Sequence, residues 1–190
     1  MGKDWLWMSA GDLGRGIEDG DIDPVALTHT YLDAIRTHAH GQRIYARLTA
    51  KTAFAQAEAA TMRAKQGTRR GLLDGVPISW KDLFDTAGVA TEAGSALLAG
   101  RVPETNAEVV DNAQAIGLVG LGKTHMSELA FSGLGLNPVT ASPPCVNDVD
   151  AASGGSSPSS GARAGRRREV RVWVTTADTR RVSAIRSMPS

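Results

Sequence analysis

The sequence has a single cysteine, few aromatic residues and no long apolar run. Cys145 cannot form a disulfide within the chain, which argues against a disulfide-stabilised secreted scaffold and favours the reducing cytoplasm. No stretch approaches the roughly 18 apolar residues of a membrane-spanning helix. No apolar core of a signal peptide follows Lys3. We therefore predict a cytoplasmic protein without a membrane segment. With 42% hydrophobic and 22% charged residues, the chain fits one globular domain or a piece of a larger one.

The net charge of +1 hides a strong asymmetry along the chain. Residues 1–162 hold 13 lysines and arginines against 18 acidic residues, whereas residues 163–190 hold eight arginines against two acidic residues. Such a break in composition needs a cause. It leads us to divide the chain into a helical segment (1–70), an α/β segment (71–162) and a basic tail (163–190), which we expect to be disordered.

Helix signals dominate the first segment. Ser9 is expected to cap a first helix. Asp23-Pro24 is a second start signal, because aspartate is a good N-cap and proline is favoured at the first helical position. We expect this second helix to end at Gly41. An alanine-rich stretch over residues 49–66 predicts a third helix.

The second segment alternates strand and helix patterns. Residues 75–80 are short and apolar, which predicts a strand. Residues 106–116 predict a helix with Asn106 as its N-cap and with Val109, Val110 and Ala113 on its buried face. Residues 118–121 predict a buried strand. A strand, a helix and a strand in succession favour parallel pairing. We therefore predict an α/β fold, in which N-terminal helices precede part of a mixed sheet with flanking helices.

Three short segments carry residues that could do chemistry, and each has an alternative explanation. Lys81 ends the first strand, but most lysines simply reach solvent. Residues 117–124 match a phosphate-binding loop formally, yet residues 118–121 predict a strand where that loop should be, so nucleotide binding is disfavoured. Residues 153–161 have the Gly/Ser composition of a flexible linker. They also close a loop over residues 133–160, and long loops are often functional.

Taken together, these segments resemble the amidase-signature family. The resemblance rests on the order and spacing of short blocks between residues 9 and 161. The blocks are Gly75-Val76-Pro77-Ile78, Lys81-Asp82, Thr86-Ala87-Gly88, Gly94-Ser95, Gly122-Lys123-Thr124, Met126, Glu128, Ser132-Gly133-Leu134-Gly135-Leu136-Asn137-Pro138 and Gly154-Gly155-Ser156-Ser157. No single block is specific, whereas the ordered series is. It also accounts for Gly-Lys-Thr without a nucleotide.

The resemblance implies a Ser-Ser-Lys triad that hydrolyses the carbon–nitrogen bond of a small-molecule carboxamide through an acyl-enzyme, with no metal and no cofactor. Lys81 matches the base, which must be neutral to accept a proton, and burial favours the neutral amine. Ser156 matches the bridging serine, which follows a cis peptide bond and relays a proton. The A subunit of the tRNA-dependent amidotransferase fits the same resemblance. The pocket residues that would distinguish a small-amide hydrolase from an amidotransferase A subunit lie beyond the segment that carries the resemblance.

The nucleophilic serine that the resemblance requires is not recognisable. The corresponding window holds Thr179-Arg180-Arg181-Val182-Ser183 and no Gly-Gly-Ser. Ser159, Ser160 and Ser183 lack the paired glycines that would supply an oxyanion hole. Pro158 also departs from the small residue that the family has there. The chain as given is therefore expected to be a non-catalytic fragment or pseudoenzyme derived from an amidase.

A shifted reading frame accounts for the tail as a hypothesis. Read one base later, arginine codons from Arg180 onward can encode Gly-Gly-Ser-Ala-Arg directly after Asp178-Thr179, which would restore the nucleophile loop of a chain that is truncated as given. Sequencing the gene around this position tests it. The alternatives are a solvated basic extension and a nucleic-acid-binding arm, since clustered arginines neutralise phosphates. Only Trp173 is available there to stack on bases, so nucleic acid is disfavoured. The sequence does not indicate an oligomeric state.

Overall fold

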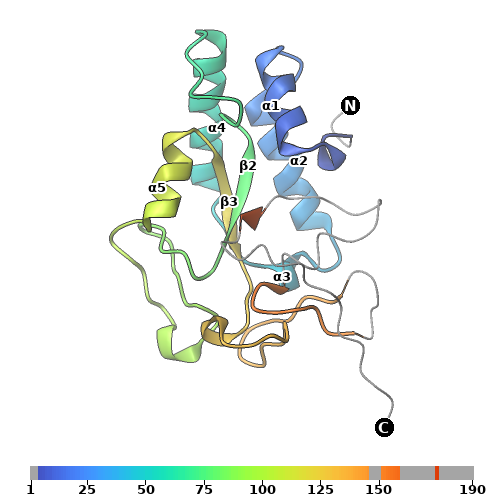
Figure 1. Cartoon of the computed structure of the whole chain (residues 1–190), viewed down its shortest axis with the longest axis vertical. Helices are drawn as coiled ribbons and strands as arrows, with labels where there is room; N and C mark the ends of the chain where they lie inside the picture. The colour runs from blue at the N-terminus through green and yellow to red at the C-terminus, as the bar shows by residue number, and fades with distance from the viewer. Residues whose placement is uncertain (1–3, 146–150, 159–173, 176–190) are drawn as a thin grey trace.

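A computed structural model describes residues 4–145, 151–158 and 174–175. In chain order the elements are the 3-10 helix η1 (Asp4–Trp7), helices α1 (Ala10–Glu18), α2 (Pro24–Thr37) and α3 (Gly41–Ile44), strand β1 (Tyr45–Leu48), helix α4 (Ala50–Lys65), strand β2 (Pro77–Lys81), the 3-10 helix η2 (Ala96–Leu98), helix α5 (Glu108–Ala115), strand β3 (Val119–Thr124), the 3-10 helix η3 (Glu128–Ala130) and strand β4 (Val174–Thr175). Figure 1 shows α1, α2 and α4 gathered at one end of the molecule around β2 and β3, with irregular segments at the other end. This arrangement confirms the predicted α/β class.

The first two long helices begin where the sequence predicts. Ser9 accepts a hydrogen bond from the backbone N–H of Asp12 at 3.1 Å. Asp23 accepts one from the backbone N–H of Ala26 at 2.9 Å, and Pro24 occupies the first helical position. Each cap satisfies an N–H group that has no partner inside its helix.

The four strands form one mixed sheet in the order β1-β3-β2-β4. β2 and β3 pair in parallel, with Pro77 opposite Val119 and Lys81 opposite Thr124. β1 pairs with β3 in the antiparallel direction. The parallel pair confirms the strand, helix and strand unit that the sequence predicts.

Two hydrophobic clusters cover the two faces of the sheet. The larger one packs Val119 and Leu121 of β3 against α1, α2 and α4. The smaller one packs Ile78 and Trp80 of β2 against Val110 of α5. Successive side chains of a strand point to opposite faces, so Trp80 and the next residue of β2 serve different faces of the sheet.

The predicted end of the second helix is wrong. The helix ends at Thr37 with His38 as its C-cap, and Gly41 begins the short helix α3 instead. A Cβ atom at Gly41 would lie 2.1 Å from the carbonyl oxygen of Ile35, so glycine is required here for close packing of the chain. Strand β1, which follows α3, was not predicted, because its sequence Tyr-Ala-Arg-Leu is short and has no β-branched residue.

The predicted N-cap of α5 is also wrong. Ala107 is the N-cap, while Asn106 accepts a hydrogen bond from the backbone N–H of Ala87 and donates one to Asp111, both at 2.7 Å. Val110 and Ala113 are buried as predicted, whereas Val109 is 39% exposed, because the helix turns Val110 toward the sheet. The position of the N-cap depends on the contact with Ala87, which is distant in sequence.

Of the basic tail over residues 163–190, the structure describes only Val174–Thr175, which pairs with β2 in parallel. The prediction of disorder for the remainder lies outside the described residues, and the division into three segments stays a prediction. No helix within the described part of the chain is long and apolar enough to cross a membrane.

Candidate active site

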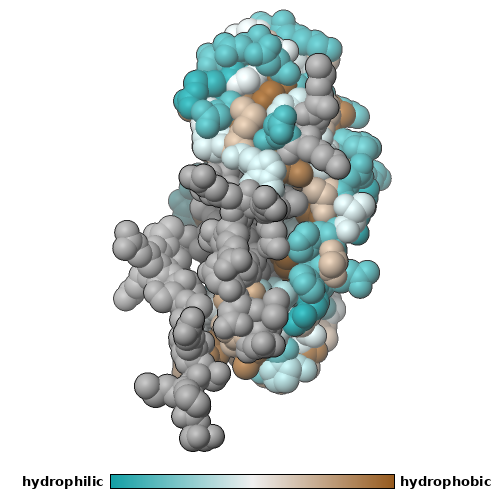
Figure 2. Space-filling model, turned by 90° about the vertical axis from the view of Figure 1, so that its right-hand side faces the viewer, coloured by the Kyte–Doolittle hydropathy of each residue, from teal (hydrophilic) through white to brown (hydrophobic). Residues whose placement is uncertain are grey.

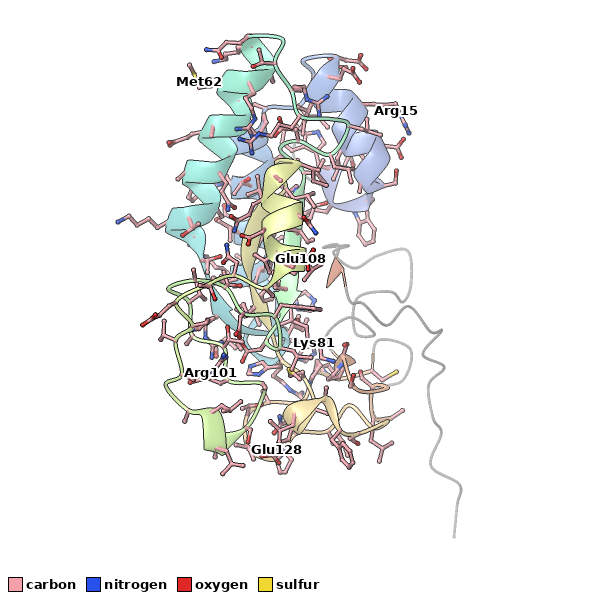
Figure 3. All side chains as sticks on the ribbon, turned by 60° about the vertical axis from the view of Figure 1, so that its left-hand side comes forward. Arg15, Met62, Lys81, Arg101, Glu108 and Glu128 are labelled. Carbon is pink, nitrogen blue, oxygen red and sulfur yellow. The ribbon has the colours of Figure 1, made fainter. Side chains whose placement is uncertain are left out.

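Lys81 is the last residue of β2 and lies at the point where the strands meet the irregular segments (Figure 3). It is 5% exposed, so the alternative of a lysine that simply reaches solvent is wrong. Alternation along β2 places it on the same face as Ser79, whose hydroxyl lies 2.7 Å from the hydroxyl of Tyr45 on β1. This face is opposite to the one that carries Trp80.

The structure brings Lys81 and Ser156 together across 75 residues of sequence. Lys81 Nζ donates a hydrogen bond to Ser156 Oγ at 2.7 Å. The peptide bond between Gly155 and Ser156 is cis, as the family resemblance leads us to expect. A serine with a lysine at this distance has a partner that can hold or accept its proton.

The backbone around Ser156 is fixed by close contacts. Gly155 donates from its backbone N–H to the carbonyl oxygen of Gly133 at 2.7 Å. A Cβ atom at Gly155 would lie 2.2 Å from the carbonyl oxygen of Ser132, so only glycine fits. Ser127 donates from its backbone N–H to the carbonyl oxygen of Ser156 at 3.3 Å. The loop therefore holds the serine in one position relative to β3.

A buried cluster of charges lies beside Lys81. Asp82 is 2% exposed and pairs with Arg47 of β1, which also pairs with Glu92. Burial raises the pKa of Asp82, and the positive charges of Arg47 and Lys123 only partly oppose that rise. The backbone N–H of Asp82 donates to the carbonyl oxygen of Thr124 at 3.1 Å. These contacts fix the chain directly after Lys81.

Lys123 belongs to the same cluster. It is 1% exposed, and its Nζ donates to the carbonyl oxygen of Phe84 and to Thr91 Oγ1, with Asp82 Oδ1 4.0 Å away. Burial lowers the pKa of Lys123 to about 8, although the negative charge of Asp82 raises it. Gly122-Lys123-Thr124 lies in strand β3 rather than in a loop, and the amine is already used. The argument against a phosphate-binding loop is therefore confirmed.

Sequence reasoning missed the roles of Arg47, Asp82 and Glu92 in this cluster. Asp82 and Lys123 lie in blocks that the sequence singled out, but nothing in the spacing indicated that they meet. Arg47 carries no sequence signal, because its contacts with Asp82 and Glu92 span 35 and 45 residues. Only the pairing of β1 with β3 brings it to the site.

The residues considered as nucleophiles lie outside the described part of the chain. Ser159, Ser160 and the window Thr179–Ser183 lie outside it, as do all eight arginines of the tail. Within residues 4–145, 151–158 and 174–175 there is also no group of three or more His, Cys, Asp or Glu residues that could hold a metal ion.

This α/β core carries the ordered blocks of the amidase-signature family, which defines the class of protein. Residues 26–168 match the sequence profile of the family described as Amidase, so the chain belongs to the amidase family. This confirms the resemblance drawn from the short blocks.

Several relatives resemble the chain over most of its length. The chain is 39% identical over 153 residues to the A subunit of the glutamyl-tRNA(Gln) amidotransferase of Anaeromyxobacter dehalogenans (strain 2CP-C), a match that covers 80% of this chain and 31% of the relative. The native peptide amidase of Stenotrophomonas maltophilia has a similar fold, with a TM-score of 0.75 and 30% identity, over 83% of this chain and 34% of that one. A crystal structure of an amidase gives a TM-score of 0.73 with 31% identity, over 82% and 35%. The chain therefore spans about a third of the length of these relatives.

Proposed function

We propose that this chain carries the proton-transfer half of an amidase active site, which hydrolyses a small-molecule carboxamide to an acid and ammonia or an amine. The observation that carries the proposal is the hydrogen bond of 2.7 Å between Lys81 Nζ and Ser156 Oγ. Membership of the amidase family supports the reaction class. We place this chemistry in the cytoplasm, in keeping with the single cysteine.

Lys81 and Ser156 would move one proton in a relay. A nucleophilic hydroxyl gives its proton to Ser156 Oγ, which passes its own proton to the neutral amine of Lys81. The nucleophile then attacks the amide carbon, and an acyl-enzyme forms when the carbon–nitrogen bond breaks. Lys81 returns the proton through Ser156 to the leaving nitrogen. Water then gives a proton to the same relay as it attacks the acyl carbon, and the relay returns that proton to the nucleophile oxygen when the acid leaves.

The nucleophile would come from outside the described residues. We propose that a frame shift has replaced its Gly-Gly-Ser loop by the arginine-rich run around Arg180, as the codon argument allows. The chain as given then retains the relay and lacks the attacking group, which makes it a non-catalytic fragment of an amidase. An intact frame that encodes this arginine run would remove the proposal about the tail.

Release of ammonia from benzamide tests the catalytic proposal on the full chain. If the chain has turnover, Lys81→Ala and Ser156→Ala should each lower it about 10²–10⁴-fold, the usual contribution of general acid–base catalysis. Lys51→Ala is the matched control, because Lys51 is an exposed lysine of α4. Turnover that persists in Lys81→Ala would contradict the relay. Absence of turnover in the unmodified chain would support the fragment.

A second candidate function is that of an amidotransferase A subunit. It is favoured by the relatives from Anaeromyxobacter dehalogenans and Thermobifida fusca, which are both A subunits of glutamyl-tRNA(Gln) amidotransferases and share 39% and 37% identity with this chain. In that role the chain would act on its amide together with other subunits. Ammonia release that rises on addition of the remaining subunits of the Anaeromyxobacter enzyme would support this candidate. Release that is indifferent to them would favour the independent amidase.

A further inference from the structure

A cavity of about 240 Å³ lies on the face of the sheet opposite to Lys81. Its walls come from α4, α5, β2, β3 and the loop over residues 86–89, and Figure 3 shows α4 and α5 beside one another at this face. Polar side chains of Thr52 and Gln56 on α4 and of Gln114 on α5 line it together with Trp80 and Gly120. The cavity is separate from the pair of residues proposed for the proton relay.

The cavity exists because β3 carries a glycine where a side chain would project into it. Gly120 pairs with Ile78 and lies on the same face as Trp80. A Cβ atom at Gly120 would meet Gln56 Oε1 and Trp80 Nε1, each at 3.6 Å, which is ordinary van der Waals contact. The backbone therefore tolerates a side chain here. The space beside Gly120 is therefore open because glycine has no side chain, and not because a larger residue would be sterically excluded.

The wall of the cavity offers an unused hydrogen-bond donor. Trp80 is 5% exposed, and its indole N–H has no acceptor among the residues that the structure describes. Gln56 Oε1 accepts from the backbone N–H of Gly120 at 2.8 Å, which fixes that amide beside the indole. Trp80 Nε1 is not among the fully buried polar atoms that lack a partner, so the indole N–H is open to the cavity and can donate to a ligand there.

The charges around the cavity indicate a neutral ligand. Lys123 is the charged residue among those that line it, and its Nζ already donates to Phe84 and Thr91 inside the protein. An ionised ligand would therefore lose its hydration without gaining a free counter-charge. The apolar part of the wall, from Ile78, Leu118 and the ring of Trp80, suits a planar hydrocarbon body.

We propose that this cavity binds a small neutral molecule that consists of one planar apolar ring and a hydrogen-bond acceptor, with the acceptor bound by the indole N–H of Trp80. The volume sets the size, because drug-sized ligands occupy pockets of roughly 300–1,000 Å³. A single-ring ligand has few atoms, so its binding is expected to be weak, with a dissociation constant in the millimolar range. The site is independent of the proposed amide hydrolysis.

Titration with acetophenone tests the site on the full ¹⁵N-labelled chain. Acetophenone has a ring and one acceptor but no carbon–nitrogen bond, so it is not an amidase substrate. The four tryptophans give separate indole N–H signals in an NMR spectrum, and Trp80→Phe identifies the signal of Trp80 by its loss. The Trp80 signal should shift with saturation. In Gly120→Val, whose side chain fills the cavity, the shift should fall at least tenfold.

Controls separate this site from the active site and from loss of folding. Gly11→Ala adds a methyl group on α1, far from the cavity, and should leave the titration unchanged. Lys81→Ala should also leave it unchanged. Gly120→Val retains the indole N–H, so a Trp80 signal that stays well dispersed before acetophenone is added reports that the variant is folded. A Trp80 signal that does not move, that moves equally in Gly120→Val, or that stops moving in Lys81→Ala would overturn the proposal.

Discussion

At the scale of single residues, Lys123 is a cation in a place that disfavours charge. Its amine donates to Phe84 and Thr91 and lies near Asp82, yet burial lowers the pKa of Lys123 from 10.5 to about 8. Lys123 and Asp82 together hold the chain after Lys81 against β3. The stability of that region is therefore linked to pH.

We expect the free energy of unfolding to rise with pH near pH 8. The folded chain releases the Lys123 proton near pH 8, whereas the unfolded chain keeps it to about pH 10. Between these values the unfolded state binds more protons, so higher pH favours the folded state. Between pH 7 and pH 9, the free energy of unfolding measured in urea should rise by about 1 kcal/mol more in the unmodified chain than in Lys123→Met. A difference between the two proteins that does not depend on pH would contradict this.

At the scale of elements, Asp23 connects the start of α2 to α4. One carboxylate oxygen caps α2 through the backbone N–H of Ala26 at 2.9 Å, and the other accepts from Thr61 Oγ1 of α4 at 3.1 Å. Capping satisfies a helix N–H, whereas the contact with Thr61 is an exposed tether between two helices. The two roles can be separated by substitution.

Asp23→Ala should lower the free energy of unfolding by about 0.5–2 kcal/mol, which is the usual cost of losing an N-cap. Asp23→Asn keeps an acceptor and should cost less. Thr61→Ala removes only the tether and should change stability by less than about 0.5 kcal/mol, as exposed substitutions do. Urea unfolding measures all three. If Asp23→Ala and Thr61→Ala lower the free energy of unfolding equally, the contact with Thr61, and not the helix cap, is the interaction that stabilises the fold.

At the scale of the whole molecule, several large apolar side chains of the described residues are exposed to solvent. Leu97 of η2 is 84% exposed, and Phe131, which follows η3, is 96% exposed. Figure 2 shows hydrophobic side chains at the surface in several places among hydrophilic ones. β4 pairs with β2 only at Ser79 and Trp80. Exposed apolar side chains and strand edges are surfaces on which another polypeptide can pack or pair.

We expect a separate polypeptide with the remaining two thirds of an amidase relative to bind this chain. The peptide amidase of Stenotrophomonas maltophilia is suitable, because the chain covers 34% of it. The mixture should elute as a complex in size-exclusion chromatography and release ammonia from an amide. Lys81→Ala should abolish that release, and Lys51→Ala should not. A complex whose ammonia release survives Lys81→Ala would contradict the proposed relay.

The local features of the fold were largely predictable. Ser9 and Asp23 mark the starts of their helices because a side-chain acceptor next to an orphan N–H acts over a few residues. The parallel pairing of β2 and β3 followed from the strand, helix and strand pattern. The cap at Asn106 was mispredicted because that side chain is used by Ala87, nineteen residues away.

The sequence by itself determined the family, the α/β class and the two residues of the proposed relay, because these depend on the order of short blocks. Only the tertiary structure decided that Lys81 and Ser156 lie 2.7 Å apart and that Arg47 joins Asp82 beside them. It also decided that Gly120 opens a cavity under Trp80. Each of these depends on contacts between segments far apart in the chain, whose burial and distances no local pattern encodes.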